Sequence, residues 1–101
     1  MSISELRDKL DLVDADLIQL LGQRLKLCLQ IADEKLRNGL PMMQPHRVEF
    51  VRQRCATLGQ QAGLDTAFVK KLYAMIIEEA CRCEDEHMHA SALASEQSPS
   101  T

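Results

Sequence analysis

An apolar stripe with helical spacing runs through the first third of the sequence. Its members step by three or four residues, and they are Leu6, Leu10, Val13, Leu17, Leu20, Arg24, Cys28, Ile31 and Lys35. Residues at these intervals share one face of an α-helix. The segment Ser2-Ile3-Ser4-Glu5 has the capping-box pattern that begins a helix, and Asn38-Gly39 is typical of a helix end. We therefore predict one helix from about Ser2 to Leu36 or Arg37.

This predicted helix is too long for a compact domain of 101 residues. About 33 residues span about 50 Å in a helix, whereas a compact chain of this size has a radius of gyration of about 13 Å. A second copy of the chain is the simplest cover for the stripe, because symmetric pairs are the commonest oligomers. We expect an intertwined homodimer. The alternative is a monomeric bundle in which the helix breaks at Gly22.

Two further helices follow the first one. Pro45 suits the first position of a helix that continues to about Gln61 and stops before the next glycine. Asp65 has the position of an N-cap for a third helix. We expect its apolar face, which runs through Leu72, Ile76, Ala80 and Cys83/Glu84, to carry it to a point between His87 and Ala90.

The composition agrees with a single all-α domain. The chain is 46% hydrophobic but has no Trp, one Tyr and two Phe, so its core must be aliphatic. The C-terminal residues are rich in Ser, Ala and Glu and lack periodic apolar positions, which is typical of disorder. The sequence thus predicts a three-helix protomer over residues 1–90 and a disordered tail over residues 91–101.

Charge and hydropathy exclude several classes of partner. A net charge of −3 argues against a broad nucleic-acid or membrane surface. The N-terminal residues lack the apolar region of a signal peptide, and no stretch approaches the roughly 18 apolar residues that a membrane span needs. We expect a cytoplasmic protein with no nucleic-acid and no membrane partner.

The four cysteines Cys28, Cys55, Cys81 and Cys83 lie within helical patterns, without the loop-rich character of disulfide scaffolds. We interpret them as reduced thiols. Cys83 and His87 are four residues apart and suggest a metal site. However, two cysteines separated by one residue in a helix point about 200° apart, which is unlike the usual chelating spacing. We expect no metal and no cofactor.

Two cations interrupt the apolar stripe. Arg24 and Lys35 are eleven residues apart, which is close to three helical turns, so both head groups point the same way. One interpretation is that each side chain extends along the core and reaches water with its charged end. The other is a pocket for a polyanion, because burying an unpaired cation is costly. Their recurrence on one stripe favours the pocket.

Two more charged residues lie where a pocket would form. Arg47 falls in the first turn of the second predicted helix, where backbone N–H groups already favour an anion. Glu84 continues the apolar face of the third helix, where burial would raise its pKa and let the protonated form donate a hydrogen bond. Both residues also fit a solvated helix end. No nucleophile with a base is evident, which suits a reaction promoted by orientation and electrostatics.

The pattern of charged and apolar residues resembles that of the all-helical chorismate mutase family. The resemblance covers residues 4 to about 88, and its motifs are Leu6-Arg7-Asp8-Lys9-Leu10, Asp14-x-x-Leu17-Ile18-x-Leu20-Leu21-x-x-Arg24, Lys35, Pro41 and Arg47. It implies an interlocked dimer of three-helix chains with two active sites. Each site would come mostly from one chain and be completed by the first arginine of the other, which accounts for the long helix.

The resemblance also implies roles for individual residues. Arg24 and Arg47, with Arg7 of the partner chain, would hold the two carboxylates of a chorismate-like substrate. Lys35 would donate to the ether oxygen of the enolpyruvyl group, and Glu84 stands where many relatives have Gln for the same task. Such donors lower the barrier to a (3,3)-sigmatropic rearrangement by stabilising the oxygen as its bond breaks.

Gln44 and Val48 depart from the usual family pattern, which has an acidic residue at each of these positions to contact the C4 hydroxyl. With Met43 and Ala80 they complete the expected substrate-binding set. The segments 41–48 and 79–86 look most like the branch that converts 4-amino-4-deoxychorismate to 4-amino-4-deoxyprephenate, a precursor of p-aminophenylalanine-type antibiotics. Alternatives are a prephenate-forming chorismate mutase, an isochorismate-pyruvate lyase, and a non-catalytic helical dimerisation module.

Overall fold

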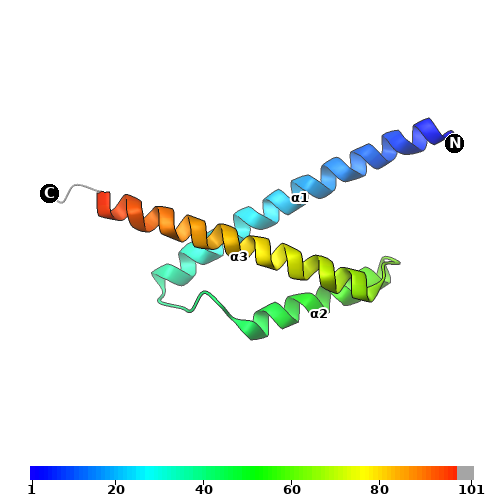
Figure 1. The fold of residues 1–101 in the computed structure, drawn as a ribbon. Coiled ribbons are helices and arrows are strands. Elements are labelled where there is room, and N and C mark those ends of the chain that lie inside the picture. Colours follow the sequence, from blue (N-terminus) through cyan, green and yellow to red (C-terminus); the bar gives the residue numbers. More distant parts are fainter. Residues whose placement is uncertain (98–101) are drawn as a thin grey trace.

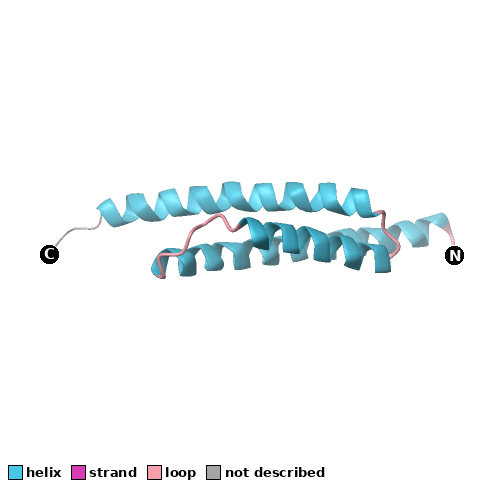
Figure 2. Cartoon of the chain, turned by 90° about the horizontal axis from the view of Figure 1, so that it is seen from below, coloured by secondary structure: helices cyan, strands magenta, loops and turns pink. Residues whose placement is uncertain are grey.

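A computed structural model describes residues 1–97, and over that range it contains three helices and no strand. They are α1 (Ile3–Arg37), α2 (Pro45–Gln61) and α3 (Thr66–Gln97). Figure 1 shows α2 folded back alongside the first part of α3, while α1 crosses α3 near its middle. Figure 2 shows the same elements edge-on as a flattened stack of helices. The predicted all-α class is confirmed.

The first helix begins and ends where its sequence signals predict. Ser2 is the N-cap, and its hydroxyl oxygen accepts a hydrogen bond of 3.1 Å from the Glu5 backbone N–H. At the other end, the Leu40 N–H donates to the Lys35 carbonyl at 2.8 Å, and Gly39 has a φ of 65°. This is the Schellman arrangement, which requires a left-handed residue. The helix passes through Gly22 without interruption, so the alternative of a break there is wrong.

The turn between α2 and α3 repeats this arrangement. Leu64 N–H donates to the Gly59 carbonyl at 2.8 Å, and Asp65 then caps α3 by accepting from the Phe68 N–H at 2.9 Å. The two helices also approach closely at Gly59. A Cβ added there would lie 2.6 Å from a methyl carbon of Val69. The tight turn and this close approach fix α2 against α3.

The third helix is longer than the sequence predicted. Its expected end between His87 and Ala90 is wrong, because α3 continues to Gln97. The physical reason lies in residues 91–97, where Ala, Leu, Glu and Gln favour helix and no Gly or Pro interrupts it. Lack of apolar periodicity does not by itself end a helix. Residues 98–101 of the predicted tail lie outside the described part of the chain.

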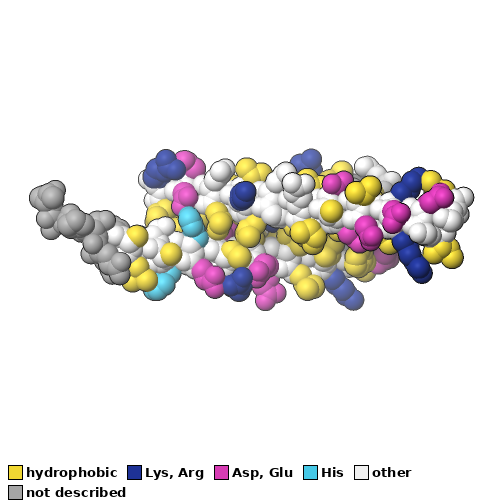
Figure 3. Space-filling model, turned by 90° about the horizontal axis from the view of Figure 1, so that it is seen from above, with side chains coloured by type: hydrophobic (Ala, Val, Ile, Leu, Met, Phe, Trp, Pro, Cys, Tyr) yellow, Lys and Arg dark blue, Asp and Glu magenta, His cyan; other side chains and the backbone are white. Residues whose placement is uncertain are grey.

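A single protomer has almost no core. Its radius of gyration is 18.2 Å, compared with about 13 Å for a compact chain of this size. Among residues 1–94 the buried apolar side chains are those of Ala32, Ala56, Val69 and Ala80, and none of them is large. Apolar side chains instead gather along the exposed seam between α1 and α3 (Figure 3). No helix within residues 1–97 has both the length and the apolar character needed to cross a bilayer.

Candidate active site

A cavity of about 270 Å³ lies where the three helices and the connection between α1 and α2 meet. Its walls are formed mainly by aliphatic and sulfur-containing side chains, and cationic and amide groups from α1 and α2 project into it. The lining residues are Arg24, Cys28, Ile31, Lys35, Met42, Met43, Gln44, Arg47, Val48, Val51, Ile77, Ala80, Cys81 and Glu84. Charged groups thus converge on a largely apolar chamber, as a small polyanion would require.

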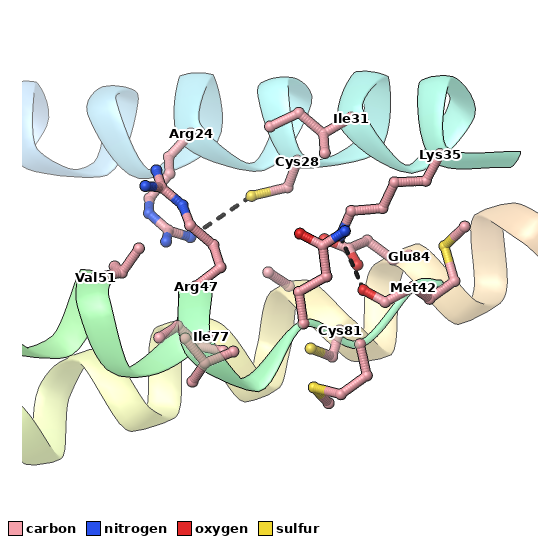
Figure 4. A pocket seen from close by; sticks show the side chains of 14 residues that line it. Arg24, Cys28, Ile31, Lys35, Met42, Arg47, Val51, Ile77, Cys81 and Glu84 are labelled. Carbon is pink, nitrogen blue, oxygen red and sulfur yellow. Dashed lines mark hydrogen bonds between the residues drawn. The ribbon is translucent and has the colours of Figure 1, made fainter. Parts of the chain in front are cut away.

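The first helix supplies two half-buried cations to the cavity. Figure 4 shows Arg24 and Lys35 extending from α1 toward the other two helices. The Arg24 guanidinium lies 3.6 Å from the Cys28 sulfur, and its central carbon lies 5.7 Å from the centre of the Tyr73 ring. That ring offers its π-face to the cation, and the guanidinium N–H groups other than the one that donates to Cys28 can bind an anion.

Lys35 is held in the cavity by the chain that follows its own helix. Its ammonium donates a hydrogen bond of 2.8 Å to the backbone carbonyl oxygen of Met42, shown as a dashed line in Figure 4. The carbonyl is neutral, so the positive charge of Lys35 is not cancelled. An ammonium group has three N–H donors, and the remaining donors are available to an oxygen atom in the cavity.

The second helix contributes Arg47 from its first turn. The central carbon of this guanidinium lies 5.1 Å from the centre of the Phe50 ring, and the side chain extends toward the same part of the cavity as Arg24 (Figure 4). Gln44 is the N-cap of α2, but its side chain makes no capping hydrogen bond. The helix start therefore adds a cation, the positive end of the helix dipole, and an amide that makes no capping bond.

Glu84 is the carboxyl group of the cavity, and it is half-buried on α3. Burial raises its pKa above the ordinary value of 4.5, and Asp85 adds to this, while Lys35 and Arg24 act in the opposite direction. The net direction is upward, which favours the protonated form relative to an exposed glutamate. Such a group can donate a hydrogen bond as well as accept one.

Eight of the nine site residues predicted from the sequence line this cavity. They are Lys35, Glu84, Arg24, Arg47, Gln44, Val48, Met43 and Ala80. The ninth, Arg7, lies 17 residues before Arg24 on the same helix, about 25 Å away along its axis. It does not reach the cavity of its own chain, and its predicted place in the site of a partner chain stays a prediction.

The sequence argument missed part of the apolar wall. Ile77 and Cys81 line the cavity from α3, although the predicted apolar face of this helix ran through Ile76, which lines a separate groove between α1 and α3. Counting back from Glu84 by helical intervals gives positions 81, 80 and 77, which would have found them. Burial also raises the pKa of the Cys81 thiol, so this wall is neutral as well as apolar.

The cysteines and histidine weighed as metal ligands have other neighbours. His87 Nε2 lies 2.8 Å from the Asp33 carboxylate oxygen, and Cys83 lies beside Arg82 and Glu79 on the surface of α3. All four cysteines are free thiols.

Comparisons with known proteins identify relatives over most of the chain. Residues 6–85 match the family described as chorismate mutase type II. A Streptomyces venezuelae protein named 4-amino-4-deoxychorismate mutase is 42% identical over 94 residues, which cover 93% of this chain and 91% of that protein. A Streptomyces pristinaespiralis protein of the same name is 43% identical over 84 residues, covering 83% of this chain and 65% of the relative. The bifunctional chorismate mutase/prephenate dehydratase of Escherichia coli K12 is 31% identical over 75 residues, or 19% of its length.

Proposed function

This chain belongs to the chorismate mutase type II family and is an isomerase, and from that premise we propose that it converts 4-amino-4-deoxychorismate to 4-amino-4-deoxyprephenate. The names and the identities of the two Streptomyces relatives support this choice of substrate over chorismate itself. The product would serve as a precursor of p-aminophenylalanine-type antibiotics. The reaction is a (3,3)-sigmatropic rearrangement in which the ether C–O bond breaks while a new C–C bond forms.

The observation that carries the proposal is the convergence of three cations on one apolar cavity. Arg24 and Arg47 would hold the carboxylates of the substrate, because guanidinium groups bind carboxylates through paired hydrogen bonds. Binding at two points would keep the two reacting ends of the substrate close together, which removes much of the entropic barrier. No residue needs to form a covalent bond with the substrate.

Lys35 and Glu84 would stabilise the ether oxygen as it gains negative charge. Lys35 is anchored on the Met42 carbonyl and still has N–H groups to donate. The raised pKa of Glu84 supports a protonated carboxyl that donates to the same oxygen. Donors that bind the transition state more tightly than the substrate raise the rate of the chemical step.

Gln44 and Val48 would distinguish the C4 substituent. With both positions neutral, the usual acidic acceptors for a C4 hydroxyl are missing. The Gln44 amide has no capping bond to break, so its oxygen can accept a hydrogen bond from a C4 amino group. Val48 would pack against the substrate ring next to its C4 amino group.

Two chains would be needed for a complete site. The stripe on the N-terminal half of α1 is exposed in one protomer, and a second copy that covers it would carry its own Arg7 toward the first copy's cavity. We therefore propose an intertwined homodimer, in which Arg7 of the partner chain completes the carboxylate site.

The substrate assignment is tested by incubating the pure protein separately with 4-amino-4-deoxychorismate, chorismate and isochorismate. We expect the highest kcat/KM with the first and 4-amino-4-deoxyprephenate as its product. Prephenate as the best product, or salicylate with pyruvate from isochorismate, would overturn the assignment in favour of a chorismate mutase or a lyase. A Lys35→Ala preparation, purified in parallel, controls for a contaminating host enzyme.

The shared site is tested by mixing two inactive variants. Arg7→Ala and Lys35→Ala each damage every site of their own homodimer. A mixed dimer formed by unfolding and refolding them together has one site with both residues intact. We expect activity to return in the mixture, and a mixture no more active than its components would exclude a site shared between chains.

A further inference from the structure

We infer that Asp33 and His87 form a bridge between α1 and α3 that positions Lys35 and Glu84 relative to each other. The positioning role of this Asp33–His87 bridge rests on the functions proposed above for Lys35 and Glu84. Neither bridge residue lines the cavity. They are positioning residues that act on the reaction through the helices they join.

The bridge connects parts of the chain that are far apart in the sequence. His87 Nε2 and Asp33 Oδ1 are 2.8 Å apart although the residues are 54 positions apart. The other ion pairs among residues 1–94 join residues three or four positions apart on a single helix, such as Arg37 with Glu34. Those pairs cannot control the distance between two helices, and the Asp33–His87 bridge can.

The two side chains are also better shielded than the surface pairs. The side chain of His87 is 35% exposed and that of Asp33 is 43% exposed, compared with 71% for Arg37 and 60% for Glu34. A hydrogen bond to a carboxylate is stronger when water has less access to it. The imidazole can donate from Nε2 either as the cation or as the neutral tautomer with its proton there, so the bond does not depend on one protonation state.

The position of the bridge matches that of the two donors. Asp33 lies two residues before Lys35, within the same helical turn, and His87 lies three residues, about one turn, after Glu84. The helices that carry the donors are therefore tied together beside them.

The geometry of the helix crossing makes such a tie effective. Ala80 is buried and lines both the cavity and the groove between α1 and α3, so it marks a place where α3 packs on α1. His87 lies seven residues beyond Ala80, about 10 Å further along the axis of α3. Glu84 lies four residues beyond Ala80, about 6 Å along the axis, so a change in crossing angle of about 10° would move it by about 1 Å. A misplacement of about 1 Å in a catalytic group can reduce a rate about 100-fold.

The test compares single and double variants with the aminodeoxy substrate. We expect Asp33→Ala and His87→Ala each to lower kcat about tenfold and to leave KM within about twofold, because the arginines that bind the carboxylates are not tied by the bridge. The double variant should be no worse than either single one. Glu34→Ala and His89→Ala, which change exposed neighbours on the same two helices, should retain the wild-type kcat.

Rescue by conservative variants separates positioning from a purely structural role. Asp33→Asn keeps an oxygen acceptor and His87→Gln keeps a donor, so each should recover most of kcat. Because these variants preserve the bridge, they also keep the test informative if an alanine variant fails to fold. A bridge that only stabilises the fold would lower the thermal midpoint and leave kcat at 25 °C unchanged, which would overturn the inference.

The outcome can be distinguished from a failure of the proposed function. If wild type turns over the substrate and Lys35→Ala does not, the proposed donors stand. A wild-type kcat in Asp33→Ala would then overturn the bridge alone. If wild type turns over none of the three substrates of the panel, both the proposed function and the positioning role of the bridge are overturned.

Discussion

The two halves of α1 carry the same sequence pattern in different surroundings. Residues 24–37 lie against the cavity, where Ala32 is buried and both cations are half-buried. Residues 3–20 extend away from α2 and α3 (Figure 1), and Leu10 and Leu17 on their stripe are 56% and 54% exposed. The comparison teaches that helical periodicity specifies which face of a helix will be covered, but not what covers it.

Making the exposed stripe polar is the most direct test of whether a second chain covers the N-terminal half of α1. In a Leu10→Asp, Leu17→Asp variant we expect loss of the dimer and of activity, because each buried leucine contributes about 1.5 to 3 kcal/mol and two chains lose two each. Light scattering after size exclusion measures the mass, and turnover measures the site.

The matched control for this variant is Ala15→Asp with Gln19→Asp. It adds the same charge to the opposite face of the same helix half. We expect a dimer with near wild-type activity. If the stripe variant also remained an active dimer, the N-terminal half of α1 would have no role in assembly.

At the cavity half of the helix, the largest effect should come from Lys35→Ala. Removing one donor to a developing oxyanion costs about 3 to 4 kcal/mol, or about 100- to 1,000-fold in kcat. Lys26→Ala removes an exposed cation from the same helix and should leave kcat unchanged. Steady-state kinetics on both variants separate a transition-state contact from a general effect of charge.

A smaller effect is expected from the pH dependence of Glu84. Its raised pKa means that the protonated donor is present below that pKa and is lost as the pH rises through it. We expect kcat/KM to fall about fivefold over the first full pH unit above this pKa, and Glu84→Gln to remove the fall because an amide does not titrate. A flat profile in wild type together with an active glutamine variant would contradict the acid role.

The smallest effect should come from the free end of α1. Ser2→Ala removes the hydroxyl that accepts from the Glu5 N–H and should cost about 1 kcal/mol of folding stability, with kcat unchanged. Thermal unfolding followed by circular dichroism measures the cost. A change in kcat of the same size as in Lys35→Ala would mean that the two halves of the helix do not act separately.

Much of the fold was predictable because its signals are local. The N-caps Ser2 and Asp65 and the first-turn Pro45 place the helix starts from a few neighbouring residues. The end of α3 was not predictable in the same way, because its last residues favour helix one by one but have no apolar periodicity to show that they are helical.

The site was predictable where charge interrupts an apolar face. Arg24, Lys35 and Glu84 stand out for this reason, and all three line the cavity. Ile77 has the same character as any core residue, so nothing in its own identity marks it as part of a site. The Asp33–His87 contact joins residues 54 positions apart and depends on the crossing angle of two helices, which local signals do not specify.

The placement of Tyr73 has a practical consequence. The chain has no Trp and one Tyr, so its near-ultraviolet emission comes from this single phenol. The ring lies 5.7 Å from the Arg24 guanidinium, beside the cation that a dicarboxylate would draw away or polarise. The fluorescence of Tyr73 could therefore report whether the cavity is occupied. Titrations could follow ligand binding to unlabelled protein in this way, without waiting for turnover.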